Sequence, residues 1–465
     1  MYSQSMEPTE NKDDDVFRVI PVDIWADIMC RLPDKDLFRS KCVSKIWCFF
    51  ISEVCIPLRP RPVVGLYFRS FPIPRGYEFE SLIHRAEGVP AMNNLLGDWI
   101  PLKEDRFYTS GHYVSFHQNG CPQLFGWVER ATSSFSFLPF TTDPEDLIDC
   151  CNGLHLFFDT ESFQYHVCNP LNKQSVLVVL PESTPRSERY DEEYSFNAAL
   201  VFDPRISPHY KVVRYDRLFR HYYVSWEEIR SPQALERRIR ESQSRKKRLF
   251  LDIYHSFNRR WSRHSVNIDP LILEQEWVRC STYFNGSLFR LSYSWHLIQF
   301  EIIGLEEGEM VSARLIELPL TYKMCQGLIG CIGVLMGMLC YANEYGNNIH
   351  IWSLDEKKKG WSLRHMIDID VHLMSTGLVR MREGGGPYTK WVGPVSFHPT
   401  SNVIFLGTPV VILSYNLDNN KLEELVRIEN DIIVPGCLMP ALPNVSLFSP
   451  FGEASNPANR IQITN

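Results

Sequence analysis

Histidine and cysteine, the residue types that most often bind metals, are numerous in this sequence but lack metal-binding spacing. The chain of 465 residues has 14 histidines and 13 cysteines. His112, His117 and His209 have no partner at i, i+4 and no neighbouring ligand, whereas zinc sites need such clusters. The cysteines form no C-x-x-C pair, and Cys150 and Cys151 are adjacent rather than spaced. We therefore predict no metal site, and we interpret the odd, scattered cysteines as reduced thiols.

Sequence motifs for catalysis or cofactor binding are also absent. There is no G-x-S-x-G nucleophile elbow, no phosphate-binding loop and no dinucleotide fingerprint. The glycine-rich run at 383–387 is not followed by a helical pattern that would offer an anion site, so we interpret it as a flexible loop. We expect a non-catalytic protein without a cofactor. The alternative, an enzyme, would need an active site assembled from distant loops.

The stretch IPVDIWADIMCRLPDKDLFRSKCVSKIW, residues 20–47, has the pattern of short helices. Ile24, Ile28 and Leu32 recur every four residues, which places them on one face of a helix. Pro33 should end that helix, because the residue before a proline avoids the α conformation.

Two further helices are expected in the same block. Asp34 is a suitable N-cap for the second, whose apolar side would carry Leu37 and Phe38. The third is expected to begin near Ser44 and to continue through Trp47. A unit this small has little core of its own and is usually stabilised by docking on something larger.

The block closely resembles an F-box of the plant type, with the pattern LPxDLxxEILxRLPxKxLxRxRxVSKxW. The matching residues are Pro21, Ile24, Ile28, Arg31, Leu32, Pro33, Lys35, Leu37, Arg39, Cys42, Val43, Ser44, Lys45 and Trp47. Ile20, Trp25 and Asp36 depart from the pattern.

In that family the F-box docks on the Skp-type adaptor of a cullin-RING ubiquitin ligase. The resemblance implies an adaptor-binding surface made of Pro21, Ile24, Leu32, Pro33, Leu37, Val43 and Trp47. We expect Ile28, Val43 and Trp47 also to hold the helices together. Replacing Trp47 by alanine is expected to weaken adaptor binding by about 2–4 kcal/mol, as for buried aromatic anchors of interfaces.

From about residue 63 to 426 the sequence changes to short β-rich runs bounded by turn residues, which indicates an all-β architecture. Three segments share one plan: CNGLHLFFD (151–159), FNGSLFRLS (284–292) and MGMLCYANE (336–344). Divergent repeats of this kind favour a β-propeller, of about six to eight blades for this length, over a pair of sandwiches.

The same region resembles the F-box-associated, kelch-like region of plant F-box proteins. The resemblance rests on DCCNGLHLFF…YHVCNPLNKQSVLVVLP (149–181) and ALVFDPRISPHYKVVRY (199–215). These segments are similar to the family patterns CNGLLCL…NPxTxxxxxLP and GFGYDPxxxDYKVVR. The resemblance implies that this region captures the protein to be ubiquitinated.

Four dipeptides within the repeats are interpreted as turns rather than as functional motifs. Asn152-Gly153 and Asn285-Gly286 are typical of tight hairpins, because glycine accepts a positive φ. Asn169-Pro170 and Asp203-Pro204 are typical of turns that end a strand.

The predicted organisation has four parts. Residues 1–15 are expected to form a disordered acidic N-terminus, 16–56 the F-box, 57–443 the β-domain and 444–465 a disordered tail. The β pattern is interrupted by a basic insertion at 227–248, whose SRKKR sequence at 244–248 could be a nuclear localisation signal. A solvated loop with a charged helix is the alternative.

Charge and hydropathy indicate the compartment and the class of partner. The formal net charge is −7 and the pI about 6.1, which argues against nucleic-acid binding. The N-terminus lacks the features of a signal peptide. The apolar run at 324–343 is interrupted by four glycines, so we interpret it as buried strands joined by a tight turn rather than a membrane span. We therefore expect a cytoplasmic or nuclear location and no membrane association.

Two functional hypotheses follow. The first is a substrate-recognition subunit of an SCF (Skp-cullin-F-box) ubiquitin ligase, which binds the adaptor and through it a cullin and also captures an unknown target. The alternative is a small-molecule or glycan receptor, which would require several of the 20 tyrosines and 11 tryptophans to converge on one face of the β-domain.

Overall fold

The fold was analysed in a computed structural model of the whole chain. The structure describes residues 21–32, 34–55, 63–72, 110–116, 122–126, 129, 134–180, 197–215, 249–267, 277–292, 295–305, 308–319, 330–345, 348–355, 360–369, 392–408, 410–428, 431–433 and 441–447. The predicted disordered segment 1–15, the basic insertion at 227–248 and the glycine-rich run at 383–387 lie outside these residues.

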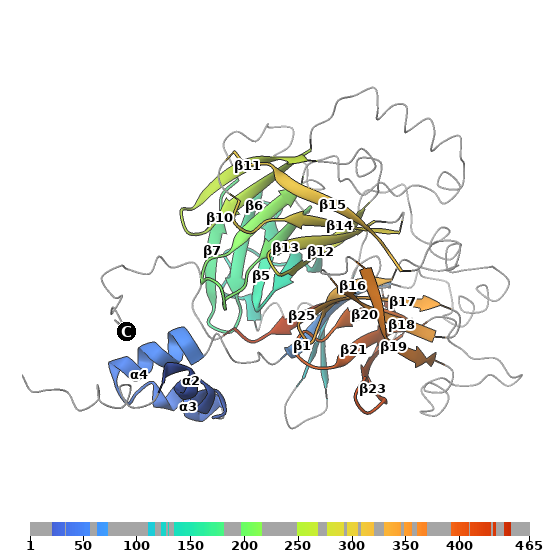
Figure 1. Cartoon of the computed structure of the whole chain (residues 1–465), viewed down its shortest axis with the longest axis horizontal. Helices are drawn as coiled ribbons and strands as arrows, with labels where there is room; N and C mark the ends of the chain where they lie inside the picture. The colour runs from blue at the N-terminus through green and yellow to red at the C-terminus, as the bar shows by residue number, and fades with distance from the viewer. Residues whose placement is uncertain are drawn as a thin grey trace, which may run out of the picture.

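The N-terminal block folds into a small helical unit as predicted, except that Asp34, the expected N-cap, is itself the first residue of the second helix. Its elements are α2 (Val22–Cys30), α3 (Asp34–Ser40), α4 (Lys45–Phe50) and the π-helical turn η1 (Ile51–Cys55). Ser44 caps α4, because its hydroxyl accepts a hydrogen bond from the Trp47 backbone N–H at 3.2 Å. Figure 1 shows this unit beside the sheets that make up the rest of the described chain.

The remainder of the described chain is mostly β, as predicted. Its strands are β1 (Val63–Pro72), β2 (Ser110–Ser115), β3 (Gln123–Gly126), β4 (Leu147–Cys151), β5 (Leu154–Asp159), β6 (Gln164–Asn169), β7 (Gln174–Val178), β8 (Ala198–Val201), β9 (Lys211–Tyr215), β10 (Phe250–His255), β11 (Arg260–Asn267), β12 (Trp277–Phe284), β13 (Ser287–Ser292), β14 (His296–Glu301), β15 (Val311–Glu317), β16 (Cys331–Leu335), β17 (Met338–Tyr345), β18 (Asn348–Asp355), β19 (Gly360–Asp368), β20 (Gly393–Phe397), β21 (Val403–Gly407), β22 (Val411–Asn416), β23 (Lys421–Arg427), β24 (Asp431–Ile433) and β25 (Leu442–Val445). A short 3₁₀ turn, η4 (Pro144–Asp146), precedes β4.

The strands form antiparallel sheet units in which consecutive strands pair. Units β4–β7, β16–β19 and β20–β23 are separate four-stranded sheets. Units β8–β11 and β12–β15 are joined into one eight-stranded sheet by a short parallel pairing of β11 with β15 at Val266–Val311 and Asn267–Ser312. The last unit combines β1, β2 and β3 with β24 and β25.

Type I′ hairpins join the first two strands of three units. In Asn152-Gly153, Asn285-Gly286 and Met336-Gly337 both residues have positive φ, as this turn requires. The two Asn-Gly predictions are therefore confirmed. In the apolar run at 324–343, the residues from 331 onward form two strands joined by a tight turn, as predicted, while residues 324–329 lie outside the described part.

The first strands of the units contact one another in chain order. β4 contacts β8, β8 contacts β12, β12 contacts β16 and β16 contacts β20. β20 then contacts β25, and β25 contacts β4, so the contacts return to their starting point. Apolar clusters fill the spaces between neighbouring units; Leu200 and Tyr165, for example, share one core.

One predicted boundary is wrong. Residues 444–447 belong to the β-domain rather than to a disordered tail, because β25 pairs antiparallel with β1 and Asn444 is buried. The sequence gives no local sign of this pairing, since its partner strand lies more than 370 residues earlier in the chain. Residues 448–465 lie outside the described part.

Candidate functional site

The helical unit has an apolar interior and a separate apolar exterior. Its core contains Ala26, Met29, Leu37, Phe50 and Ile51. The indoles of Trp25 and Trp47 pack against this core edge to face, with ring centroids 5.5 Å apart.

The predicted helical stripe of α2 faces outward. Ile24 and Ile28 are 48% and 45% exposed, and Val22 beside them is 41% exposed. Val43, in the turn between α3 and α4, is 61% exposed. An apolar surface of this kind on so small a unit is typical of a docking site.

The predicted adaptor-binding residues divide into three groups. Pro21, Ile24 and Val43 are exposed, and Leu32 and Trp47 are half-buried. Leu37 has no exposed surface, so in this structure it packs the unit and is not available to a partner. The placement of Pro33 lies outside the described residues.

Ile28 was expected to hold the helices together, and that expectation is wrong. It lies one turn after Ile24 on the outward face, whereas Ala26 and Met29 point into the core. The four-residue spacing already indicated that Ile24 and Ile28 share a face. It could not indicate which face of α2 the core would cover. Val43 is likewise outside the core.

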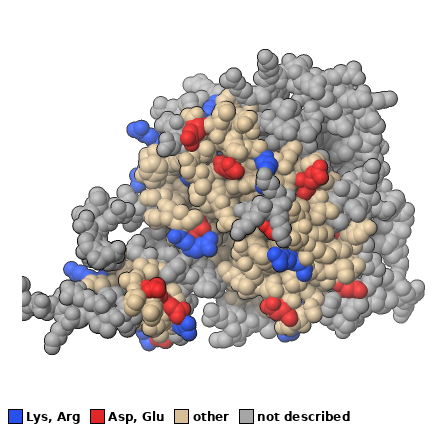
Figure 2. Space-filling model, viewed as in Figure 1, with Lys and Arg blue, Asp and Glu red and all other residues tan. Residues whose placement is uncertain are grey.

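Charged side chains flank the exposed apolar residues. Arg31 donates to Asp27 at 2.6 Å across one turn of α2, and Arg39 lies 3.9 Å from Asp36 on α3. Figure 2 shows acidic and basic side chains next to each other on this unit, and small separate groups of both signs on the β-domain. The described surface in this view therefore lacks the continuous basic patch that binds phosphate backbones.

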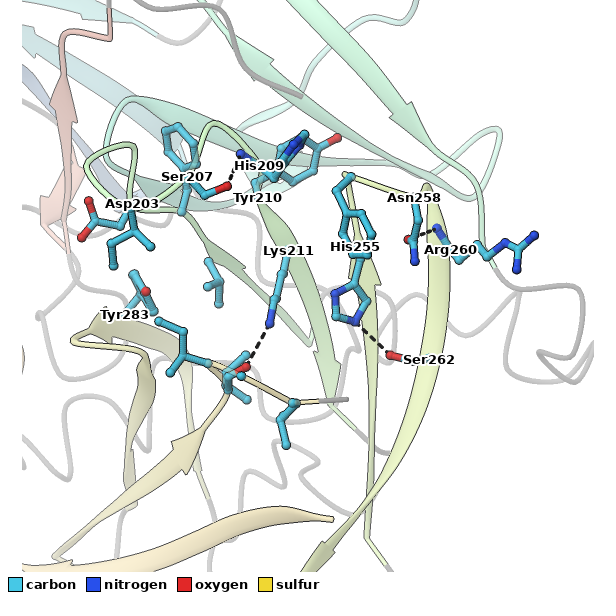
Figure 3. Close-up of a pocket in the computed structure, with 18 of the residues that line it drawn as sticks. Asp203, Ser207, His209, Tyr210, Lys211, His255, Asn258, Arg260, Ser262 and Tyr283 are labelled. Carbon is cyan, nitrogen blue, oxygen red and sulfur yellow. Dashed lines mark hydrogen bonds between the residues drawn. The ribbon is translucent and has the colours of Figure 1, made fainter. Parts of the chain in front are cut away.

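The β-domain contains a pocket of about 600 Å³ formed by the units β8–β11 and β12–β15. It is formed by the β8–β9 turn, the β10–β11 turn, the end of β12 and the segment after β14. Its lining residues include Trp261 and, as Figure 3 shows, Tyr210 and Tyr283. Its volume lies in the usual range for small-molecule sites.

Two basic groups lie close together in this pocket. The Lys211 amine donates to the carbonyl oxygen of Ile302 at 3.0 Å, and burial lowers its pKa. Burial, with the nearby Lys211 charge and His264, lowers the pKa of His255 to about 4. His255 is hydrogen-bonded through Nε2 to Ser262 at 3.0 Å, and Ser262 is hydrogen-bonded to His264 at 2.7 Å. At neutral pH His255 is therefore uncharged, and Lys211 supplies the positive charge.

A second cavity, of about 480 Å³, lies where the first strands of the units meet. Turn residues from several units line it, including Asn152, Asn285 and Gly337. Asp149, on its wall, accepts hydrogen bonds from the backbone N–H groups of Leu200 and Cys150, and burial raises its pKa to about 7. Burial raises the pKa of the Cys150 thiol, which keeps it protonated and weakly reactive.

Ser70, His112 and Asp431 have the composition of a catalytic triad but not its geometry. In a triad the carboxylate orients the imidazole through Nδ1, and Nε2 receives the serine proton. Here the Ser70 hydroxyl donates to Asp431 at 2.5 Å, and both residues lie on the Nε2 side of His112. The group therefore lacks a base for the serine, and it joins strands β1, β2 and β24 instead.

Among the residues that the structure describes, no group of three or more His, Cys, Asp or Glu side chains could hold a metal ion. No described helix is long and apolar enough to cross a membrane.

Comparison with known proteins identifies the helical unit. Residues 19–59 match the F-box domain family, so the chain carries an F-box domain at its N-terminal end. No curated protein matches the sequence.

Several solved structures have weakly similar traces. A Bacteroides uniformis protein assigned as a 6-phosphogluconolactonase shares 12% identity over 70% of this chain and 79% of its own, with a TM-score of 0.30. A Lactobacillus plantarum protein shares 8% identity over 79% and 82%, with a TM-score of 0.33. A chain of the mitotic checkpoint complex shares 10% identity over 60% and 61%, with a TM-score of 0.27. These scores carry no inference about this protein.

Proposed function

We propose that this protein is a substrate-recognition subunit of an SCF ubiquitin ligase. The F-box would dock on a Skp-type adaptor and through it on a cullin, while the β-domain holds a target protein. The protein itself would perform no chemistry. Its contribution would be proximity, because tethering raises the effective concentration of a target lysine near the ubiquitin carrier.

The observation that carries this proposal is the outward apolar stripe on a unit that matches the F-box family. Ile24, Ile28 and Val43 expose apolar surface that the small core does not cover. We assign the adaptor contact to these residues together with Pro21, and to the exposed parts of Leu32 and Trp47. Pro33 remains a predicted contact residue.

For the β-domain we propose a six-bladed propeller. Two observations support it. The contacts between first strands return to their starting point, and β1, at the start of the domain, pairs with β24 and β25 from its end. This closure would hide the edge strands that open sheets expose.

A repeated contact between neighbouring units also supports the propeller. The Trp261 indole N–H, on β11, donates to the carbonyl oxygen of Val179, just after β7, at 2.7 Å. The Trp361 indole N–H, on β19, donates to the carbonyl oxygen of Glu317, at the end of β15, also at 2.7 Å. In both cases the last strand of one unit is fastened to the last strand of the preceding unit, as a radial array requires.

Assembly of the ligase complex tests the proposed function. The full-length chain should elute together with a purified Skp-type adaptor and cullin on size-exclusion chromatography. The variant I24D/V43D should elute separately, because a charge on the apolar stripe would be desolvated in the complex. Leu177→Asp, a matched change at a 50% exposed residue of β7, should assemble normally. Failure of the wild type to assemble would refute the proposed function, whereas equal assembly of all three proteins would refute the adaptor contact assigned to Ile24 and Val43.

A second candidate function, a small-molecule or glycan receptor, is favoured by one observation. The pocket in Figure 3 is lined by Tyr210 and Trp261 from the β8–β11 unit and by Tyr283 from the β12–β15 unit. The feature expected of such a receptor was that several tyrosines and tryptophans converge on one face of the β-domain, and here three of them line one cavity. The two functions are compatible, because the F-box lies outside this pocket.

A further inference from the structure

We propose that the 600 Å³ pocket binds a small organic anion, in which an apolar or aromatic body carries a carboxylate or a phosphate, and that Lys211 is its counter-ion. This inference names the ligand class of the receptor function and rests on that function. It does not depend on adaptor docking.

The positive and negative charges that line the pocket are not balanced. Asp203 is the pocket's acidic residue, and its carboxylate is already engaged by Arg205, with contacts of 3.0 and 2.7 Å. Among the described residues no carboxylate lies within ion-pair distance of Lys211, whose hydrogen-bond partner is the Ile302 carbonyl. An ammonium group in this position has its charge incompletely compensated, so an anion would be stabilised there.

Figure 3 shows how these groups are oriented. The Lys211 side chain extends between the turns toward Ile302, and its amine lies near the ring of His255. The Asp203 carboxylate is turned away from that amine, and the Arg260 guanidinium extends away from the pocket. Lys211 is therefore the cation that a bound anion would meet inside the pocket.

Exposed apolar side chains line the pocket around this cation. Ile206, Phe257 and Ile303 are 62%, 61% and 56% exposed, and all three line the pocket. They come from three separate turns or loops, after β8, β10 and β14. Apolar walls around one charged group are typical of sites that bind an amphipathic small molecule.

The pKa of the lysine agrees with this geometry. Burial lowers the pKa of Lys211, and the neighbouring His255 has a pKa of about 4, so at neutral pH His255 is uncharged and Lys211 is the group that an anion would meet. A bound anion would reverse the effect on Lys211, because an opposite charge nearby favours the ammonium form.

A matched set of three fluorescent probes tests the proposal: 2-naphthoate, 2-naphthyl phosphate and the uncharged 2-naphthamide. Their binding to the full-length protein is measured by fluorescence titration. We expect one or both anions to bind at least about tenfold more tightly than the amide, the ratio expected for one charge-assisted contact. The two anions distinguish a carboxylate site from a phosphate site.

Variants locate the site. Lys211→Met keeps the length of the side chain but removes its charge, and it should abolish the preference for anions. Lys421→Met makes the same change at a 63% exposed lysine of β23 and should leave the preference intact. Equal affinity of the wild type for all three probes overturns the anion assignment but leaves a receptor possible. Absence of binding by all three overturns both. An anion preference that survives Lys211→Met overturns the role of Lys211.

Should Lys211→Met fail to fold, the wild-type protein still decides the question through salt. Raising the salt from 50 to 500 mM should weaken binding of the anions and leave that of the amide unchanged. Anion binding that is insensitive to salt would contradict an ionic contact.

Discussion

The Ser70 hydroxyl donates a hydrogen bond to the Asp431 carboxylate across 361 residues of sequence. Because its single proton is used in this bond, Ser70 must accept from His112 Nε2, 2.7 Å away. The three side chains fasten β2, β1 and β24 together at the closure of the β-domain.

Removing this hydroxyl should weaken the closure. Ser70→Ala leaves the Asp431 and His112 side chains without their shared partner, which should lower the free energy of unfolding by about 1–3 kcal/mol. Ser110→Ala changes the residue directly opposite Ser70 in the β1–β2 register and should have an effect within about 0.5 kcal/mol. Urea unfolding measures both. Equal effects of the two changes would mean that the hydrogen bonds among Ser70, His112 and Asp431 contribute nothing specific to stability.

Replacing Asp252 should destabilise the β-domain more than replacing an exposed acidic residue. It accepts from Arg214, which is fully buried, and from Arg263, each at 2.7 Å. Burial raises the pKa of Asp252, but the two guanidinium groups outweigh that effect and lower it overall. Asp252→Asn leaves a buried cation poorly compensated and should cost about 3–5 kcal/mol.

Glu424→Gln provides the control for Asp252, because its pair with Arg427 is more exposed and should contribute at most about 1 kcal/mol. Chemical denaturation at pH 7 compares the two variants. A loss for Asp252→Asn no larger than for Glu424→Gln would show that Arg214 finds other compensation.

Gly153 and Gly337 have similar backbone conformations, so alanine substitutions at the two positions distinguish the cost of backbone strain from the cost of a steric clash. Gly153 and Gly337 both have positive φ, +92° and +72°. A Cβ at Gly153 would lie 2.5 Å from the Leu447 Cβ and 2.8 Å from the Val445 oxygen, whereas nothing lies within 4 Å of a Cβ at Gly337. Gly337→Ala should therefore cost about 1 kcal/mol, from the backbone conformation. Gly153→Ala should cost measurably more, since it displaces the strand that closes the domain. Equal midpoints of thermal unfolding for Gly153→Ala and Gly337→Ala would contradict the close packing of Gly153 against the segment that contains β25.

His398 should make stability depend on pH. Burial lowers its pKa to about 4, and its Nδ1 accepts from the backbone N–H groups of Thr400 and Ser401. As the pH falls from about 6.5 toward 4, the unfolded state takes up a proton that the folded state excludes. The free energy of unfolding should therefore decrease through this window and be unaffected by this group above it.

Asparagine at position 398 tests that dependence, since its amide oxygen can accept the same bonds and does not titrate. The variant His398→Asn should show a shallower loss of stability between pH 6.5 and 4 in thermal melts. His255, whose pKa is also about 4, should preserve part of the slope in the variant. Identical slopes for variant and wild type would remove His398 from the explanation.

Local sequence signals predicted the local structure well. The Asn-Gly turns, the start of the third helix near Ser44 and the strand-ending turn after Asn169 all follow from conformational preferences of a few adjacent residues. The i, i+4 stripe of Ile24 and Ile28 was also correctly placed on one face of α2.

Features that depend on distant residues could not be predicted. The core covers the face of α2 that carries Ala26 and Met29, and the packing of η1, α3 and α4 decides which face that is. The Lys211 pocket arises where turns from separate units meet, and no spacing in the sequence indicates it. The final strand, β25, could not be predicted because it pairs with β1, which begins at Val63 near the other end of the sequence.

The most direct test of the central proposal separates the F-box surface from its core. Affinity for a Skp-type adaptor and the midpoint of unfolding are measured together for I24A/V43A and for Trp47→Ala. The proposal predicts that I24A/V43A loses at least about tenfold in affinity with an unchanged midpoint, because these side chains are exposed in the free protein. Trp47→Ala should lose affinity and also lower the midpoint of the helical unit, since its indole packs against Trp25. Wild-type affinity in I24A/V43A would contradict the proposal that the outward stripe of α2 is the adaptor contact.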